Sequence, residues 1–132
     1  MTKRLAVPLL VLACLAPAAL QQPKQQSQNQ LEVAEAKGER QERRIMLDGR
    51  VKDTGQRALY RLVLVFDLMN SEQKVISSRK GPIEEDVLEP GEEGSFHFDV
   101  PDQTWAVQFG VRAASEKATD FEVLRPGPYP IE

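Results

Sequence analysis

The residues best suited to acid–base chemistry surround the single histidine of the chain, His97. Ser95, His97 and Asp99 are the residue types of a hydrolytic triad. They belong to the alternating segment SFHFDVP, in which Phe96 and Phe98 take the opposite parity. Residues i and i+2 of one strand lie roughly 6.5–7 Å apart on the same face, too far for the hydrogen bonds of a triad. The spacing therefore predicts an exposed strand histidine.

An acidic segment over residues 84–93 is the second candidate for chemistry. Its six carboxylates belong to Glu84, Glu85, Asp86, Glu89, Glu92 and Glu93. Carboxylates on a loop suit Ca²⁺, but the spacing is not that of an EF-hand, and charge runs are usually solvated. Glu84, Glu85 and Asp86 are therefore weak metal candidates, and we predict no cofactor. The two catalytic carboxylates of a glycosidase would need a cleft, which a domain with such simple loops rarely forms. We therefore predict that the protein is not an enzyme.

The first twenty residues bear on the compartment. A basic start, MTKR, precedes the apolar run LAVPLLVLACLAPAAL, which ends in small residues. This layout is typical of a secretory signal peptide, and we expect cleavage after Ala18 or Ala19. An uncleaved membrane anchor is an alternative, although the run is short for a bilayer and contains two prolines. A bacterial lipobox, VLAC, is another, in which Cys14 carries the lipid. Cys14 is the only cysteine, so no intrachain disulfide can form.

The charge balance bears on the partners. The chain of 132 residues has 17 basic and 20 acidic residues, and its net charge of −3 becomes about −5 without Lys3 and Arg4 of the targeting segment. Nucleic-acid binding depends on clustered positive charge, and the small group at residues 40–44 is the only further basic cluster. We expect an exported protein, periplasmic or extracellular, with no nucleic-acid partner. It would contact a membrane only through an uncleaved N-terminal segment or a lipidated Cys14.

Four segments follow from composition and periodicity. We expect a signal peptide at 1–19, a flexible glutamine-rich spacer at 20–30, a domain at 31–125 and a proline-rich terminal linker at 126–132. Apolar alternation with turn signals at near-regular intervals predicts about seven short strands in the domain. A helix over residues 31–44 is the alternative there, but Gly38 interrupts it and a wide apolar stripe is missing. The predicted fold is all-β, an antiparallel immunoglobulin-like sandwich of two sheets.

The strand parities give a core and a candidate surface. The predicted core comprises Leu47, Val51, Leu62, Leu64, Phe66, Leu68, Phe96, Phe98, Trp105, Val107, Phe109 and Val111. Gly49 shares the apolar parity of its strand, where a missing side chain leaves room for a neighbour or marks a bulge. The segment RALYRLVLVFDLMN is apolar on both sides, which predicts a central strand or a covered second face. If Leu59, Val63 and Val65 on that second face stay uncovered, they are a candidate patch for an envelope protein partner.

The stretch VFDLMN resembles the signature of the FxLYD domain family, a small immunoglobulin-like module of exported bacterial and archaeal proteins. The matching positions are Gly49, Val51, Asp53, Phe66, Leu68, Leu88, Pro90, Gly91, Glu92 and Phe96. Asp53 replaces an asparagine of the family, and Met69 and Asn70 stand where the family has tyrosine and aspartate. The resemblance covers residues 45–111. The family has no established catalytic residues, so the resemblance implies structural roles for these positions.

These observations predict a non-catalytic exported module that binds or scaffolds other envelope or extracellular components. The alternative is an ion- or small-ligand-binding domain that uses the acidic residues 84–93.

Overall fold

The computed structural model describes residues 29–115 and 121–132, and it contains ten strands and no helix in these ranges. The strands are β1 (Gln30–Gln41), β2 (Arg44–Asp53), β3 (Leu59–Tyr60), β4 (Val63–Met69), β5 (Val75–Pro82), β6 (Val87–Leu88), β7 (Glu93–Pro101), β8 (Gln108–Ala114), β9 (Glu122–Leu124) and β10 (Tyr129–Pro130). The predicted signal peptide, Cys14 and the spacer up to residue 28 lie outside the described residues. Within the described ranges, no helix has the length and hydropathy that a membrane crossing requires.

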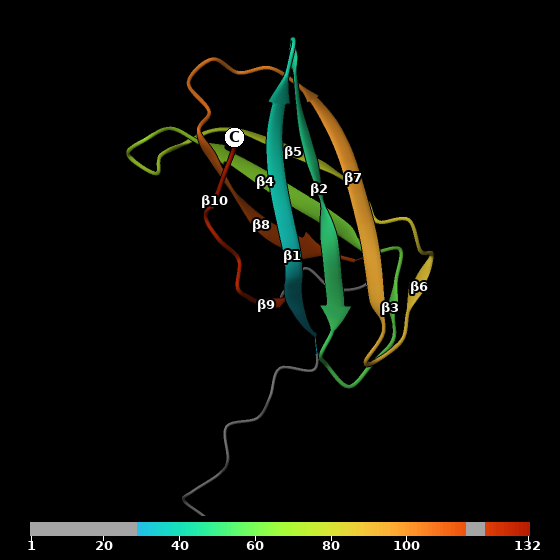
Figure 1. Cartoon of the computed structure of the whole chain (residues 1–132). Coiled ribbons are helices and arrows are strands. Elements are labelled where there is room, and N and C mark those ends of the chain that lie inside the picture. The colour runs from blue at the N-terminus through green and yellow to red at the C-terminus, as the bar shows by residue number, and fades with distance from the viewer. Residues whose placement is uncertain (1–28, 116–120) are drawn as a thin grey trace, which may run out of the picture.

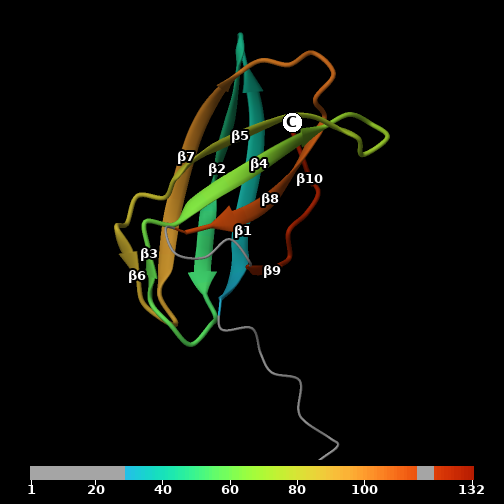
Figure 2. The ribbon, with the colours of Figure 1, turned by 180° about the vertical axis from the view of Figure 1, so that it is seen from behind.

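The strands form two layers, which confirms the predicted sandwich. One sheet has the order β7-β2-β1-β9 and the other β10-β8-β4-β5, while β3 and β6 form a separate two-stranded ribbon. Figures 1 and 2 show the two sheets from opposite sides, with the ribbon at one end of the sandwich. The pairing is antiparallel except between β1 and β9. The three strands beyond the expected seven, β3, β6 and β10, are short pieces of two residues each.

The predicted alternation is present in the long strands. In β2, Ile45, Leu47 and Val51 are fully buried while the residues between them reach the surface. The helix considered for residues 31–44 is absent, because this segment forms β1 and the turn into β2. β4 lies between β8 and β5, which confirms it as a central strand. In β2 and β4, burial of alternate side chains on one face thus favours extended backbone.

Neighbouring atoms approach Gly49 closely, as expected from its place among the inward-facing residues of its strand. A side chain there would place its Cβ 2.1 Å from the carbonyl oxygen of Glu35 and 2.6 Å from the ring of Phe96. Glu35 follows an irregularity in the β1–β2 register. A glycine is therefore required where the neighbouring backbone and an aromatic ring crowd the strand.

Phe66 lies at the centre of the core. Its ring centroid is 5.2 Å from that of Phe96, 4.8 Å from that of Phe98 and 6.1 Å from that of Phe109. Tilted and edge-on aromatic contacts of this kind add to the burial of apolar area. Phe98 itself is only half-buried, at the margin of the core.

The predicted places of Trp105 and Val107 in the core are wrong. Trp105 is 75% exposed and Val107 is 42% exposed. The alternation that predicted their burial holds only inside a strand, and β8 begins at Gln108. Residues 102–107 form a loop, from which Ala106 enters the core instead.

Two segments expected to be loop or linker contain strands. The acidic segment holds β6, which pairs with β3 and buries Leu88 and Leu59 against the core. The proline-rich tail holds β10, which pairs with β8 at the edge of its sheet. Pro130 fits this position because an edge strand leaves one row of backbone groups unpaired.

Candidate functional site

The sandwich is closed along one lateral side by the C-terminal tail. The amide of Ile131 donates to the carbonyl of Val107 at 2.9 Å, and the amide of Glu132 donates to the carbonyl of Gly38 at 2.9 Å. The amide of Arg40 in turn donates to the carbonyl of Glu132 at 2.8 Å. The tail therefore bonds to both sheets. The edge strands on this side, β9 and β10, are short and leave little backbone unpaired.

The opposite lateral side, which we call the open side, carries the two long edge strands. β5 has eight residues and pairs only with β4, while β7 has nine residues and pairs only with β2. Residues 84 and 85 cover the start of β7, since Glu84 donates its amide to the carbonyl of Ser95 and the Glu85 carboxylate accepts from the amide of Ser95. Within the described chain, no such cover lies along the outer edge of β5. An unpaired edge is a template for a further strand.

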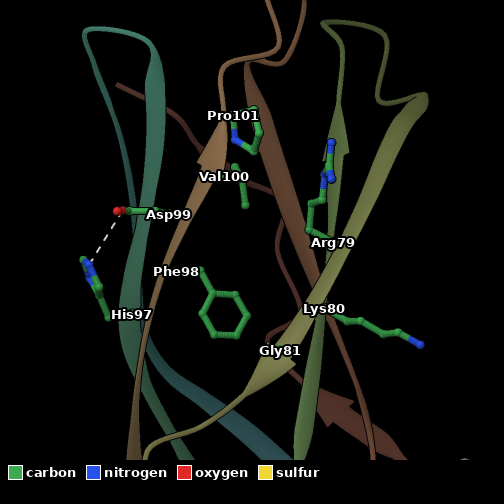
Figure 3. A pocket seen from close by; sticks show the side chains of 8 residues that line it. All are labelled: Arg79, Lys80, Gly81, His97, Phe98, Asp99, Val100 and Pro101. Atoms are coloured by element: carbon green, nitrogen blue, oxygen red, sulfur yellow. Dashed lines mark ion pairs between the residues drawn. The ribbon is translucent and has the colours of Figure 1, made fainter.

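A slot of about 330 Å³ lies between β5 and β7 on the open side. Figure 3 shows Phe98 and Val100 projecting from β7 into the slot, opposite Arg79 and Gly81 of β5. His97 projects away from the slot on the other side of β7, and Lys80 projects away on the other side of β5. The inward-facing residues of both edge strands thus line the slot.

β5 lacks an apolar inner face. Its register places Ser77, Arg79 and Gly81 opposite Leu68, Phe66 and Leu64, which are the buried residues of β4. The ring of Phe98 lies over Gly81, where a Cβ would come within 2.5 Å of it. Phe98 therefore connects the slot with the core through its contact with Phe66.

Arg79 brings an uncompensated positive charge to the slot. The guanidinium groups of Arg40, Arg44, Arg50 and Arg112 each lie within ion-pair distance of a carboxylate. Among the described residues, Arg79 makes no ion pair and no side-chain hydrogen bond. The sequence contains a signal for this site. The inward-facing residues of β5 are Ser77, Arg79 and Gly81, and none of them is an apolar core residue.

The structure confirms His97 as an exposed strand histidine, with half of its side chain accessible. Its Nδ1 contacts the Asp48 carboxylate on the neighbouring strand, and its Nε2 lies 3.7 Å from Asp99. The hydrogen bond that the His97 Nδ1 donates to the Asp48 carboxylate is the main cause of a raised His97 pKa. Among the described residues, His97 contacts two acids and makes no hydrogen bond with Ser95, so the triad types of the sequence do not converge.

The acidic residues 84–93 do not assemble a site in the described chain. No group of three or more His, Cys, Asp or Glu side chains is placed to hold a metal ion within the described ranges. The carboxylate of Glu92 accepts from the amide of Glu89 at 2.8 Å, and that of Glu85 from Ser95 at 2.9 Å. These carboxylates therefore fasten the segment to its own turn and to β7.

The candidate patch of Leu59, Val63 and Val65 is only partly present. Leu59 is 3% exposed and belongs to the β3–β6 ribbon, so its place in the patch is wrong. Val63 and Val65 are half-buried on the outer face of β4, in a shallow hollow shared with Lys80 and Ala114. Strand β3 ends before β4 begins, so the alternation of side chains in β4 does not extend to Leu59.

The same outer face contains a buried carboxylate that the alternation did not reveal. Asp67 accepts two hydrogen bonds from Arg112, at 2.6 and 2.8 Å, and one from the Ser78 hydroxyl at 2.7 Å. Hydrogen bonding from Arg112 is the main reason that the Asp67 pKa is lowered. A second buried carboxylate, Asp53, has a pKa raised by burial, although the amide of Gly55 donates to it.

Trp105 lies on a loop that Arg40 holds in place. The Arg40 Nε donates to Asp102 at 2.8 Å, and its Nη2 donates to the carbonyls of Gln103 and Ala106 at 3.0 and 2.8 Å. An exposed tryptophan on a fastened loop is a typical contact residue of protein interfaces. It lies on residues 102–107, which directly follow the slot residue Pro101.

Comparison with known proteins identifies no family. No family model and no curated protein matches the chain. The fold is similar to part of β-glucosidase 3B from Thermotoga neapolitana, with a TM-score of 0.44, 15% identity, and 76% of this chain and 16% of that chain covered. It is also similar to part of a β-glucosidase from Kluyveromyces marxianus, with a TM-score of 0.38, 19% identity, and 77% and 14% covered. The chain thus spans less than a fifth of either enzyme, and likenesses this distant carry no functional argument.

Proposed function

We propose that this chain is a non-catalytic exported module that binds or scaffolds another polypeptide of a prokaryotic cell envelope through its open side. The observation that carries the proposal is the difference between the two lateral sides. The tail closes one side by bonding to both sheets, whereas the other leaves the eight-residue edge of β5 unpaired beside a slot. Main-chain groups of an open edge supply affinity for an added strand, and adjacent pockets supply selectivity.

The N-terminal sequence and the resemblance noted above support the exported class. Residues 1–19 have the layout of a signal peptide. We include a divergent relationship to the FxLYD family in the proposal, since its matching positions have structural roles. Phe66 and Leu68 are buried in β4, and Gly91 takes a φ of +87° at the turn before β7. That φ suits glycine, which has no side chain to clash with the backbone.

Site-specific photo-crosslinking in intact expressing cells tests the binding role. A photoreactive phenylalanine analogue replaces Ile76, an exposed residue of β5, and the same analogue at exposed Glu122 of β9 is the control on the closed side. We expect a discrete cross-linked envelope protein from position 76 and none from position 122. Equal products at both positions, or none at position 76, would contradict the proposal.

The intact mass of the same preparation tests export. Cleavage after residue 18 or 19, or acyl chains on Cys14, is the expected result. An unmodified full-length chain confined to the cytoplasmic fraction would contradict the exported class.

A further inference from the structure

The geometry of the open side specifies what a strand added to β5 must carry. Side chains of an added strand alternate between the two faces of the sheet, so every second one enters the slot beside the inner residues of β5. Those inner residues are Arg79 and Gly81, which lie two positions apart. The two neighbouring inward positions of the added strand therefore face a cation at one place and a glycine covered by an aromatic ring at the other.

Charge complementarity selects the residue that faces Arg79. The Arg79 guanidinium is exposed and makes no ion pair among the described residues. An opposite charge directly across a strand pair is stabilising, and a like charge is destabilising. An acidic residue of the partner therefore fits this position.

The Phe98 end of the slot selects an apolar residue. Phe98 is half-buried and Val100 is buried beside it, so an aliphatic side chain above Gly81 would cover exposed ring surface. On the other face of the sheet, Ser78 and Lys80 of β5 leave a polar setting for the intervening side chains. The complementary segment thus alternates polar outer residues with an inner acid and, two positions away, an inner aliphatic residue.

A second copy of the same strand is a poor occupant. If β5 pairs antiparallel with its own copy at full overlap, the Arg79 and Lys80 side chains of one chain lie near the Arg79 and Lys80 side chains of the other. Like charges at neighbouring cross-strand positions repel each other, so the edge favours a different, acidic strand. Charged edge residues of this kind also oppose edge-to-edge association of identical chains.

We propose that the open side binds an extended peptide segment of a partner protein by strand addition to β5, with an acidic side chain paired to Arg79 and an aliphatic one over Phe98. This inference rests on the proposed function, because it assigns the chemistry of the partner at the same site.

The probe is the peptide acetyl-Thr-Val-Thr-Glu-Thr-Val-Thr-amide, titrated into the full chain, with hydrogen exchange of the β5 amides as the readout. We expect the glutamate peptide to slow exchange of amides in residues 75–82. Replacement of its glutamate by lysine is expected to weaken binding about two- to fivefold, the range of an exposed ion pair. A peptide that is N-methylated over its central residues is expected not to bind, since it cannot form the main-chain hydrogen bonds.

Charge reversal on the protein provides the matched control. Arg79→Glu is expected to reverse the preference, so that the lysine peptide binds better than the glutamate peptide. Lys74→Glu makes the same charge change at an exposed turn residue next to β5 and is expected to leave the preference for glutamate in place. Both side chains are exposed, so the fold tolerates both variants.

The outcomes separate this inference from the proposed function. Equal protection of β5 by the glutamate and lysine peptides would overturn the acidic specificity and leave strand addition standing. Protection of β5 by no peptide would overturn this inference, while cross-linking at position 76 still decides the proposed function. Binding of the N-methylated peptide would show that charge alone, without strand addition, accounts for the contact, and would overturn this inference.

Discussion

Replacing Arg112 by methionine removes the guanidinium that holds the Asp67 carboxylate through two hydrogen bonds. Asp67 lies on the outer face of β4, yet its side chain is only 11% exposed, whereas that of Arg112 is 62% exposed. The methionine keeps most of the aliphatic stem that covers the sheet. The substitution therefore tests the charged contact with little change in apolar packing.

The expected loss in the free energy of unfolding lies between two limits. Exposed ion pairs contribute about 0.2–1 kcal/mol, and breaking a fully buried pair costs about 3–5 kcal/mol. Here the acid is buried and the base is mostly exposed, and Ser78 still donates to Asp67 after the substitution. We expect a loss of about 1.5–3 kcal/mol at neutral pH, the range of hydrogen bonds to charged groups.

The pH dependence identifies the cause. The Asp67 pKa is lowered in the folded protein, so its contribution to stability is fully present above the unfolded value of 3.8 and is lost as pH falls through the folded pKa. Urea denaturation at neutral pH and at successively lower pH should show the difference between wild type and Arg112→Met shrinking below that value. A difference that stays constant down to strongly acidic pH would show that the ionised Asp67 carboxylate is not the source of the lost stability.

Arg50→Met is the matched control for this prediction. Arg50 lies near two carboxylates, those of Glu35 at 3.1 Å and Glu93 at 3.2 Å, but all three side chains are about half exposed. We expect a loss of about 0.2–1 kcal/mol, because solvent screens such pairs. A loss as large as that of Arg112→Met would show that the burial of Asp67 is not what makes its pair strong.

Three further substitutions test other features of the fold. Gly49→Ala is expected to lower stability by about 1–3 kcal/mol in urea denaturation, because the new methyl group meets the carbonyl of Glu35; an unchanged midpoint would contradict this crowding. Trp105→Ala is expected to cost less than about 0.5 kcal/mol, and the fluorescence of this only tryptophan should shift little on unfolding; a large blue shift in the native state would place it back in the core. Asp53→Asn is expected to raise stability relative to wild type at neutral pH and not at low pH, because the raised pKa makes the ionised acid unfavourable as pH rises through it; equal effects at both pH values would rule this out.

Much of the fold follows from local alternation. Leu64, Phe66 and Leu68 share one parity in the sequence, and all three are fully buried. Alternation predicts burial because successive side chains of a strand point to opposite faces. It fails at Trp105, since the parity has no meaning where residues 102–107 leave the extended conformation.

The candidate site was less accessible to such reasoning. The inward parity of β5 contains Arg79 and Gly81, which predicts that the strand leaves the core there. That β5 is an edge strand, however, depends on which strands pair with β4 and β8. The predicted terminal linker is another example, because its sequence does not indicate that Ile131 and Glu132 bond to both sheets.

Taken by itself, the amino-acid sequence predicted a sandwich of extended strands and the inward-facing residues of β2, β4 and β7, since both follow from periodicity along the chain. The tertiary structure alone decided which lateral side is closed and which is open, and so placed Arg79 beside Phe98 in an accessible slot. These features arise from pairing between segments far apart in the sequence, and each pairing depends on the hydrogen bonds and packing of the whole sandwich. Local patterns of residues indicate which face of a strand is buried, but they do not specify which strands become neighbours.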